Sequence, residues 1–144
     1  MNHPPIVMRR VLKASPERVF QALVDPDLIR RWMCPEVLTV ASIENDPVVG
    51  GSFRLVMQEA DGRTYPASGL YREIDPPRRL AFSWTWENAH TMTGIETEIL
   101  IELTPEGDGT LFVMTHSNLP SEEERQSHHG GWTSAINQLE RMFS

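Results

Sequence analysis

The pattern of apolar and polar residues predicts one strand and two short helices at the start of the chain. Ile6 to Ala14 is rich in Val, Ile and Met, which favour extended structure. Ser15 then precedes a proline, and this pair is typical of a helix N-terminus. Apolar residues recur at helical spacing from Val19 to Val24. A second short helix, predicted to carry Trp32, is expected to stop at Cys34, which precedes another proline.

Beyond these helices, turn residues divide the chain into six strand-like runs. The turns fall at Asn45-Asp46-Pro47, Gly50-Gly51, Asp61-Gly62, Asp75-Pro76-Pro77 and Glu106-Gly107-Asp108-Gly109. Several runs alternate apolar and polar positions, which is typical of strands with one buried face. The alternating positions, apolar except for Thr97, include Phe53, Leu55, Met57, then Leu80, Phe82, Trp84, Trp86, then Ile95, Thr97, Ile99, Ile101 and Leu103. These runs therefore predict an antiparallel sheet with one apolar face.

A long C-terminal helix is predicted to cover that face. Ser121 is a good N-cap, and the three glutamates after it suit the positive end of the helix dipole. An apolar stripe runs from Trp132 to Phe143 at helical spacing, so the helix buries one side. The sequence therefore predicts an α+β helix-grip fold, in which a curved antiparallel sheet of about seven strands surrounds this helix. Residues 1–144 are expected to form a single domain.

Composition and charge narrow the classes of partner. The chain has 144 residues, 40% of them hydrophobic, and a formal net charge of -7, which argues against binding a phosphate backbone. A single cysteine, no secretory signal pattern and no apolar run of about 18 residues predict a cytoplasmic protein that is not integral to a membrane.

Five segments resemble a known family in the same order along nearly the whole chain. They are PERVFQALVDPDLIRRWMCP (16–35), VGGSFR (49–54), GLYREIDPPRRLAFSWTW (69–86), ELTPEGDGTLFVMTHSNLP (102–120) and HHGGWTSAINQLERMF (128–143). The chain is thereby similar to the activator of Hsp90 ATPase homologue 1-like (AHSA1-like) C-terminal domains of the START/Bet v 1 (SRPBCC) superfamily. The resemblance implies a helix-grip fold with a deep cavity between the sheet and the C-terminal helix.

The resemblance does not specify a single function. Superfamily members include lipid carriers, hormone and sterol binders, polyketide cyclases and aromatases, and co-chaperone domains. Eukaryotic Hsp90 activators carry an additional N-terminal domain, whereas this chain starts almost directly at its first strand, so a chaperone partner is disfavoured. Homodimers are common in such folds, and a homodimer is left open here.

The predicted ligand-binding residues are those expected on the inner face of the sheet and on the helix stripe, since ligand pockets are mostly apolar and aromatic. The set is Trp32, Phe53, Leu55, Met57, Tyr71, Phe82, Trp84, Trp86, Phe112, Met114, His116, His128 and Trp132. For each aromatic residue taken alone, ordinary core packing is the competing interpretation. His116 and His128 are the preferred polar anchors, followed by Tyr71 and Glu73, and a histidine is also able to move a proton near neutral pH.

The patterns for other chemistries are missing or incomplete. Adjacent His128 and His129 point about 100° apart on a helix, and no zinc spacing is present, so no metal and no cofactor are predicted. Gly50-Gly51 lacks the lysine and following helix of a phosphate loop. Cys34 has no activating partner evident in the sequence.

Three functional hypotheses remain after these exclusions. The first is binding of a hydrophobic or aromatic small molecule, and the second is a cyclase- or hydrolase-like enzyme that uses His116 or His128. The third is a module that binds an Hsp90-type chaperone. Asn88, His90 and Thr91 interrupt the strand pattern, which predicts a mobile lid at Glu87 to Gly94.

Overall fold

A computed structural model describes residues 3–88 and 92–144. The elements follow in the order β1 (Ile6–Leu12), α1 (Pro16–Val24), α2 (Pro26–Ile29), β2 (Thr39–Asn45), β3 (Ser52–Gln58), β4 (Thr64–Asp75), β5 (Arg79–Trp86), β6 (Thr97–Glu106), β7 (Gly109–Ser117) and α3 (Glu122–Met142). This order of one strand, two helices, six strands and a long helix confirms the arrangement predicted from the sequence.

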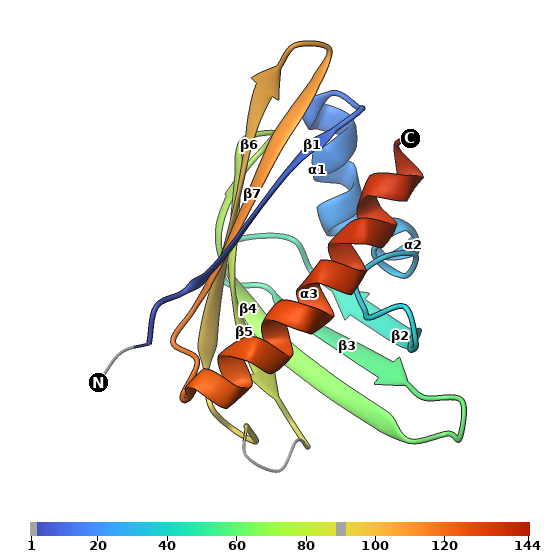
Figure 1. Cartoon of the computed structure of the whole chain (residues 1–144), viewed down its shortest axis with the longest axis vertical. Helices are drawn as coiled ribbons and strands as arrows, with labels where there is room; N and C mark the ends of the chain where they lie inside the picture. Colours follow the sequence, from blue (N-terminus) through green and yellow to red (C-terminus); the bar gives the residue numbers. More distant parts are fainter. Residues whose placement is uncertain (1–2, 89–91) are drawn as a thin grey trace.

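The seven strands form a curved sheet in the order β1-β7-β6-β5-β4-β3-β2, and neighbouring strands are antiparallel. Helix α3 crosses the concave face of this sheet diagonally, while α1 and α2 pack beside its C-terminal half (Figure 1). The register between β4 and β5 shifts between Tyr71 and Glu73, and such an irregularity increases local bending. The predicted helix-grip fold is therefore confirmed.

Local signals set the ends of the helices. Ser15 accepts a hydrogen bond from the Arg18 N–H at the start of α1, and Ser121 accepts one from the Glu124 N–H at the start of α3. Helix α2 is shorter than the sequence suggests. It ends at Ile29, and Trp32 lies in the turns that follow, where its Nε1–H donates to the Ala22 carbonyl at 2.8 Å.

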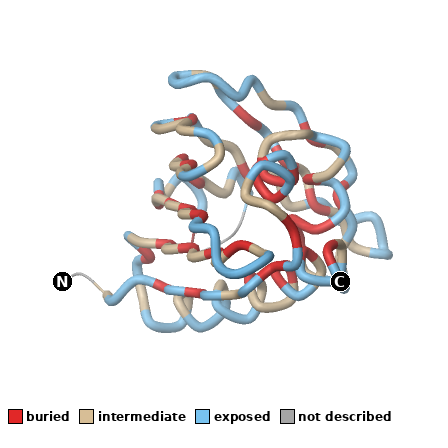
Figure 2. The backbone as a smooth tube through the Cα atoms, turned by 90° about the horizontal axis from the view of Figure 1, so that it is seen from above, coloured by how far each residue is buried: buried red, intermediate tan, exposed pale blue. Residues whose placement is uncertain are grey.

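The core lies between the concave face of the sheet and the three helices. Buried positions alternate with exposed or half-buried ones along the strands (Figure 2), as in β7, where Thr110, Phe112, Met114 and His116 face inward. At the end of β2, the Asn45 amide donates both to the carbonyl of Val24, the last residue of α1, and to the Tyr71 hydroxyl. These bonds hold α1 against the edge of the sheet.

Among the described residues, no helix is both long enough and apolar enough to cross a membrane.

Candidate functional site

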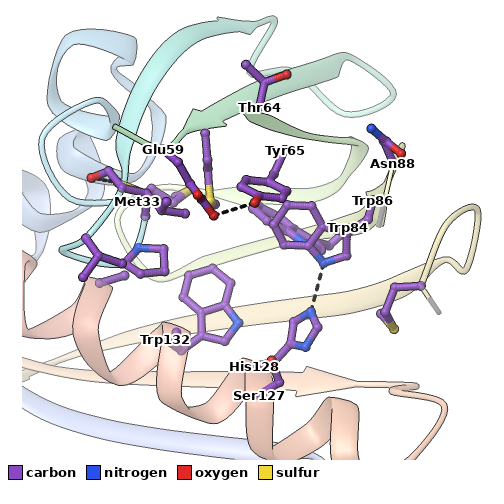
Figure 3. Close-up of a pocket in the computed structure, with 18 of the residues that line it drawn as sticks. Met33, Glu59, Thr64, Tyr65, Trp84, Trp86, Asn88, Ser127, His128 and Trp132 are labelled. Carbon is purple, nitrogen blue, oxygen red and sulfur yellow. Dashed lines mark hydrogen bonds between the residues drawn. The ribbon is translucent and has the colours of Figure 1, made fainter. Parts of the chain in front are cut away.

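A cavity of about 830 Å³ lies between the sheet and the N-terminal half of α3. Its walls come from the segment after α2, from the β3–β4 hairpin, from β5 and the residues after it, and from one side of α3 (Figure 3). The lining residues are Met33, Cys34, Pro35, Val37, Leu38, Met57, Glu59, Arg63, Thr64, Tyr65, Trp84, Trp86, Asn88, Met92, Glu124, Ser127, His128, Gly131, Trp132 and Ala135.

Three indole rings form a continuous aromatic wall in this cavity. The Trp84 and Trp86 rings lie 5.4 Å apart in an edge-to-face arrangement, and the Trp84 and Trp132 rings lie 5.7 Å apart. Trp84 and Trp132 are almost completely buried, whereas Trp86 is half-buried toward the opening. Met57 and Met92 are also buried in the lining, and methionine side chains adapt to irregular shapes. The deep part of the cavity is therefore apolar and aromatic.

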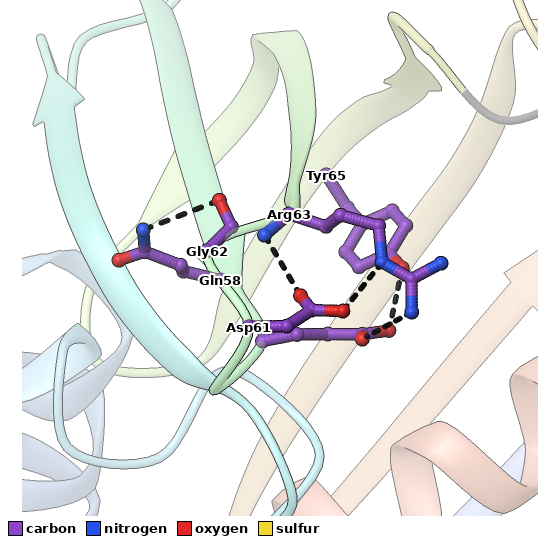
Figure 4. A network of polar contacts seen from close by, with 6 residues as sticks. Gln58, Asp61, Gly62, Arg63 and Tyr65 are labelled. Carbon is purple, nitrogen blue, oxygen red and sulfur yellow. Dashed lines mark hydrogen bonds and ion pairs between the residues drawn. The ribbon is translucent and has the colours of Figure 1, made fainter.

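The rim of the cavity is polar, and much of its charge is paired within the β3–β4 hairpin. The Tyr65 hydroxyl donates to Glu59, and the Arg63 guanidinium contacts Glu59 at 3.2 Å and Asp61 at 2.8 Å (Figure 4). The hydrogen bond to Glu59 raises the pKa of Tyr65. Gly62, with φ +94°, makes the turn that brings these side chains together. This network orients the Tyr65 ring at the cavity edge.

His116 lies directly behind the indole wall, in a fully buried position on β7. The Trp132 Nε1–H donates to His116 Nδ1 at 3.0 Å. His116 Nε2 lies 2.8 Å from the Thr97 hydroxyl, whose own proton goes to the Trp84 carbonyl. His116 Nε2 must therefore carry the ring proton, and the imidazole is neutral. Burial, assisted by nearby His128, lowers the pKa of His116 to about 3.

His128 makes a similar connection at the cavity rim. Its Nε2 accepts the Trp86 Nε1–H at 2.9 Å, as Figure 3 shows, and its Nδ1 lies 2.8 Å from the Glu124 carbonyl. Because a carbonyl only accepts, Nδ1 carries the proton in this arrangement. Two indole-to-imidazole hydrogen bonds thus join α3 to the sheet, one at the rim of the cavity and one behind its wall.

The structure brings five of the predicted site residues to the cavity: Met57, Trp84, Trp86, His128 and Trp132. The other eight lie in the packed core and do not line it: Trp32, Phe53, Leu55, Tyr71, Phe82, Phe112, Met114 and His116. Phe53 shows the reason, since its ring packs 5.4 Å from Phe82 and 5.7 Å from Tyr71 and fills the space beneath them. Glu73, the remaining polar candidate, forms an ion pair with Arg79.

Several lining residues were not found from the sequence. Met33, Pro35 and Leu38 lie in the irregular segment between α2 and β2, where no periodicity shows which side chains point inward. Tyr65 did carry a signal, because it alternates with Ala67 and Tyr71 along β4, and it pairs directly with Met57 on β3. Extending the alternation to the start of β4 would have identified it.

Features that point to other chemistry are weak in the described residues. Cys34 lines the cavity but is buried, with its thiol 3.4 Å from the Leu38 carbonyl, and burial raises its pKa. No group of three or more His, Cys, Asp or Glu side chains in ranges 3–88 and 92–144 is placed to hold a metal ion. Residues 89–91 of the predicted lid lie outside the described residues.

The fold and this site define a helix-grip protein with a cavity between sheet and helix, and comparisons with known proteins specify the family. The family model described as Activator of Hsp90 ATPase homolog 1-like protein matches residues 13–144. The chain belongs to this family. No curated protein matches the sequence of this chain.

Solved structures of related proteins share the fold over nearly the whole chain. Protein CV1439 from Chromobacterium violaceum has 26% identity and a TM-score of 0.88, with 97% of this chain and 96% of that one covered. The AHSA1 protein from Silicibacter pomeroyi has 26% identity and a TM-score of 0.83, with 96% of each chain covered. CalU16 from Micromonospora echinospora has 30% identity and a TM-score of 0.74, with 97% of this chain and 76% of that one covered.

Proposed function

We propose that this protein binds an apolar or aromatic small molecule in the cavity between the sheet and α3. The observation that carries the proposal is the size and lining of the cavity. Its volume of about 830 Å³ lies within the range of about 300 to 1,000 Å³ that is usual for small-molecule sites. Trp84, Trp132 and Met57 provide a buried apolar interior, while the exposed polar groups are at the rim.

The arrangement of the two histidines favours binding over acid–base catalysis. A general base needs a free nitrogen lone pair within reach of its substrate. His128 uses Nε2 to accept from Trp86 and Nδ1 to donate to the Glu124 carbonyl. His116 is likewise engaged at both nitrogens and lies behind the wall formed by Trp132. Both imidazoles therefore support the site structurally, which is the role expected in a binding protein.

Binding of the neutral fluorescent probe N-phenyl-1-naphthylamine provides the test. Gly131 lines the cavity on α3, and a Cβ at this position would meet only Pro35 Cγ, at 3.6 Å. Gly131→Phe therefore preserves the backbone but places a ring in the cavity. We expect fluorescence enhancement with the wild-type protein and an affinity reduced about tenfold or more in the variant, because the probe and the new ring compete for space.

Gly130→Phe is the matched control. Gly130 is the preceding residue of the same helix, is exposed, and has no atom within 4 Å of an added Cβ. The two variants change helix propensity and composition in the same way, so circular dichroism should show both folded. Gly130→Phe should bind the probe like the wild-type protein. Absence of wild-type binding, or equal affinities of the two folded variants, would refute the proposal.

A further inference from the structure

We propose that the ligand of this cavity carries a protonated amine beside its apolar or aromatic body, and that the Glu59 carboxylate binds this amine at the cavity rim. This inference rests on the proposed function and specifies the chemistry of the ligand. It comes from the charged side chains that line the cavity and from the partners that they already have.

The charges of the lining do not balance. Among the described residues that line the cavity, Glu59 and Glu124 carry a carboxylate and Arg63 carries a guanidinium. Arg63 contacts Glu59 at 3.2 Å and also Asp61, which lies outside the lining, at 2.8 Å. One guanidinium cannot neutralise two carboxylates, so this network in the β3–β4 hairpin keeps one net negative charge. Glu124 adds another carboxylate from the side of α3.

The Glu59 carboxylate is placed where a bound molecule is able to reach it. Figure 3 shows this side chain pointing from the β3–β4 hairpin toward α3, with its carboxylate beside the Tyr65 hydroxyl. The side chain of Glu59 is 32% exposed, whereas that of Arg63 is 71% exposed. One carboxylate oxygen of Glu59 accepts from Tyr65, and the other contacts Arg63. Because each oxygen has two lone pairs, Glu59 is still able to accept a hydrogen bond from a ligand.

An ammonium group suits this position better than a hydroxyl group or an anion. A cation makes a charge-assisted hydrogen bond to the carboxylate, which is about twice as strong as a neutral one. Because Glu59 is partly exposed, the ammonium keeps part of its hydration while the aromatic body enters the apolar interior formed by Trp84 and Trp132. An anionic group on the ligand would instead face the negative charge of the hairpin network.

The test uses three naphthalene probes of nearly the same shape: 1-naphthylmethylamine, which is protonated at neutral pH, 1-naphthalenemethanol and 1-naphthoate. Their relative affinities are measured by displacement of N-phenyl-1-naphthylamine from the cavity. The wild-type protein should bind the ammonium probe about five- to tenfold more tightly than the alcohol, the range expected for a charged hydrogen bond at a partly exposed site. The naphthoate should bind most weakly.

Glu59→Gln removes the charge but keeps an oxygen that is able to accept from Tyr65, so this variant should fold and lose most of the preference for the ammonium probe. Glu106→Gln is the matched control. Glu106 is exposed at the end of β6, in the β6–β7 hairpin, far from the β3–β4 hairpin (Figure 1). It changes the net charge by the same amount and should keep the wild-type preference.

Salt dependence gives a second readout that does not require a variant to fold. Raising NaCl from about 0.02 M to about 0.5 M should reduce the preference of the wild-type protein for the ammonium probe over the alcohol, because salt screens an ion pair at the rim. Equal displacement by these two probes at low salt, or a preference that Glu59→Gln retains, would overturn this inference while leaving apolar binding intact. If N-phenyl-1-naphthylamine does not bind the wild-type protein, both the proposed function and this inference fail.

Discussion

Replacing His116 with glutamine tests whether a buried neutral imidazole makes the protein sensitive to acid. Glutamine preserves both hydrogen bonds, because its Oε1 is able to accept from Trp132 and its Nε2 to donate to the Thr97 hydroxyl. It cannot titrate. The variant should therefore differ from the wild-type protein mainly in how its free energy of unfolding depends on pH.

The sign and size of the effect follow from proton linkage. The pKa of His116 is about 3 in the folded protein, below the value of 6.5 expected for an unfolded chain. Between these values the unfolded state binds a proton that the folded state does not, so stability is lost as the pH falls below about 6.5. At pH 5, about 1.5 units lower, the loss is about 2 kcal/mol, since each unit corresponds to about 1.36 kcal/mol.

Urea unfolding of both proteins at pH 7.5 and pH 5 measures this effect. The other titrating groups are shared, so the difference between the two pH dependences isolates His116. The wild-type protein should lose about 2 kcal/mol more than His116→Gln, equivalent to about 7 °C in Tm for a chain of 144 residues. Parallel pH dependences of the two proteins would show that His116 is not held neutral, and the reasoning would be wrong.

Two further pairs of substitutions test the packing of the sheet and the capping of α3. In Gly69→Ala the new Cβ would lie 1.9 Å from the Ser83 carbonyl oxygen, a backbone atom, so we expect a loss of about 3 kcal/mol in urea unfolding. Gly130→Ala, where the Cβ meets nothing within 4 Å, should instead raise the free energy of unfolding by about 0.5 to 1 kcal/mol. Similar stabilities of Gly69→Ala and Gly130→Ala would contradict the close approach of β4 and β5. Ser121→Ala should cost about 1 kcal/mol by the same assay, because the Glu124 N–H loses its acceptor, whereas Ser121→Asp should preserve most of the stability. An alanine variant as stable as the aspartate variant would show that the cap does not contribute.

The sequence by itself determined the order of the elements and the buried face of the sheet. A period of two in the strands and an apolar stripe on the last helix are local properties of the chain, so they can be read without knowing its tertiary structure. Ser15 and Ser121 marked their helix starts correctly for the same reason, since a cap bonds to an N–H three residues away. The end of α2 was less clear, because hydrogen-bonded turns continue beyond Ile29.

Only the tertiary structure decided which inward residues surround empty space. Phe53 and Trp84 carry the same alternation signal, yet Phe53 packs against its neighbours on the sheet, and Trp84 lies where α3 leaves a cavity. The indole-to-imidazole bonds of Trp86 and Trp132 join residues 42 and 16 positions apart, and no local pattern encodes such partners. Periodicity indicates the side of an element that is buried. How completely that side is filled depends on the placement of other elements, which is set by packing across the whole fold.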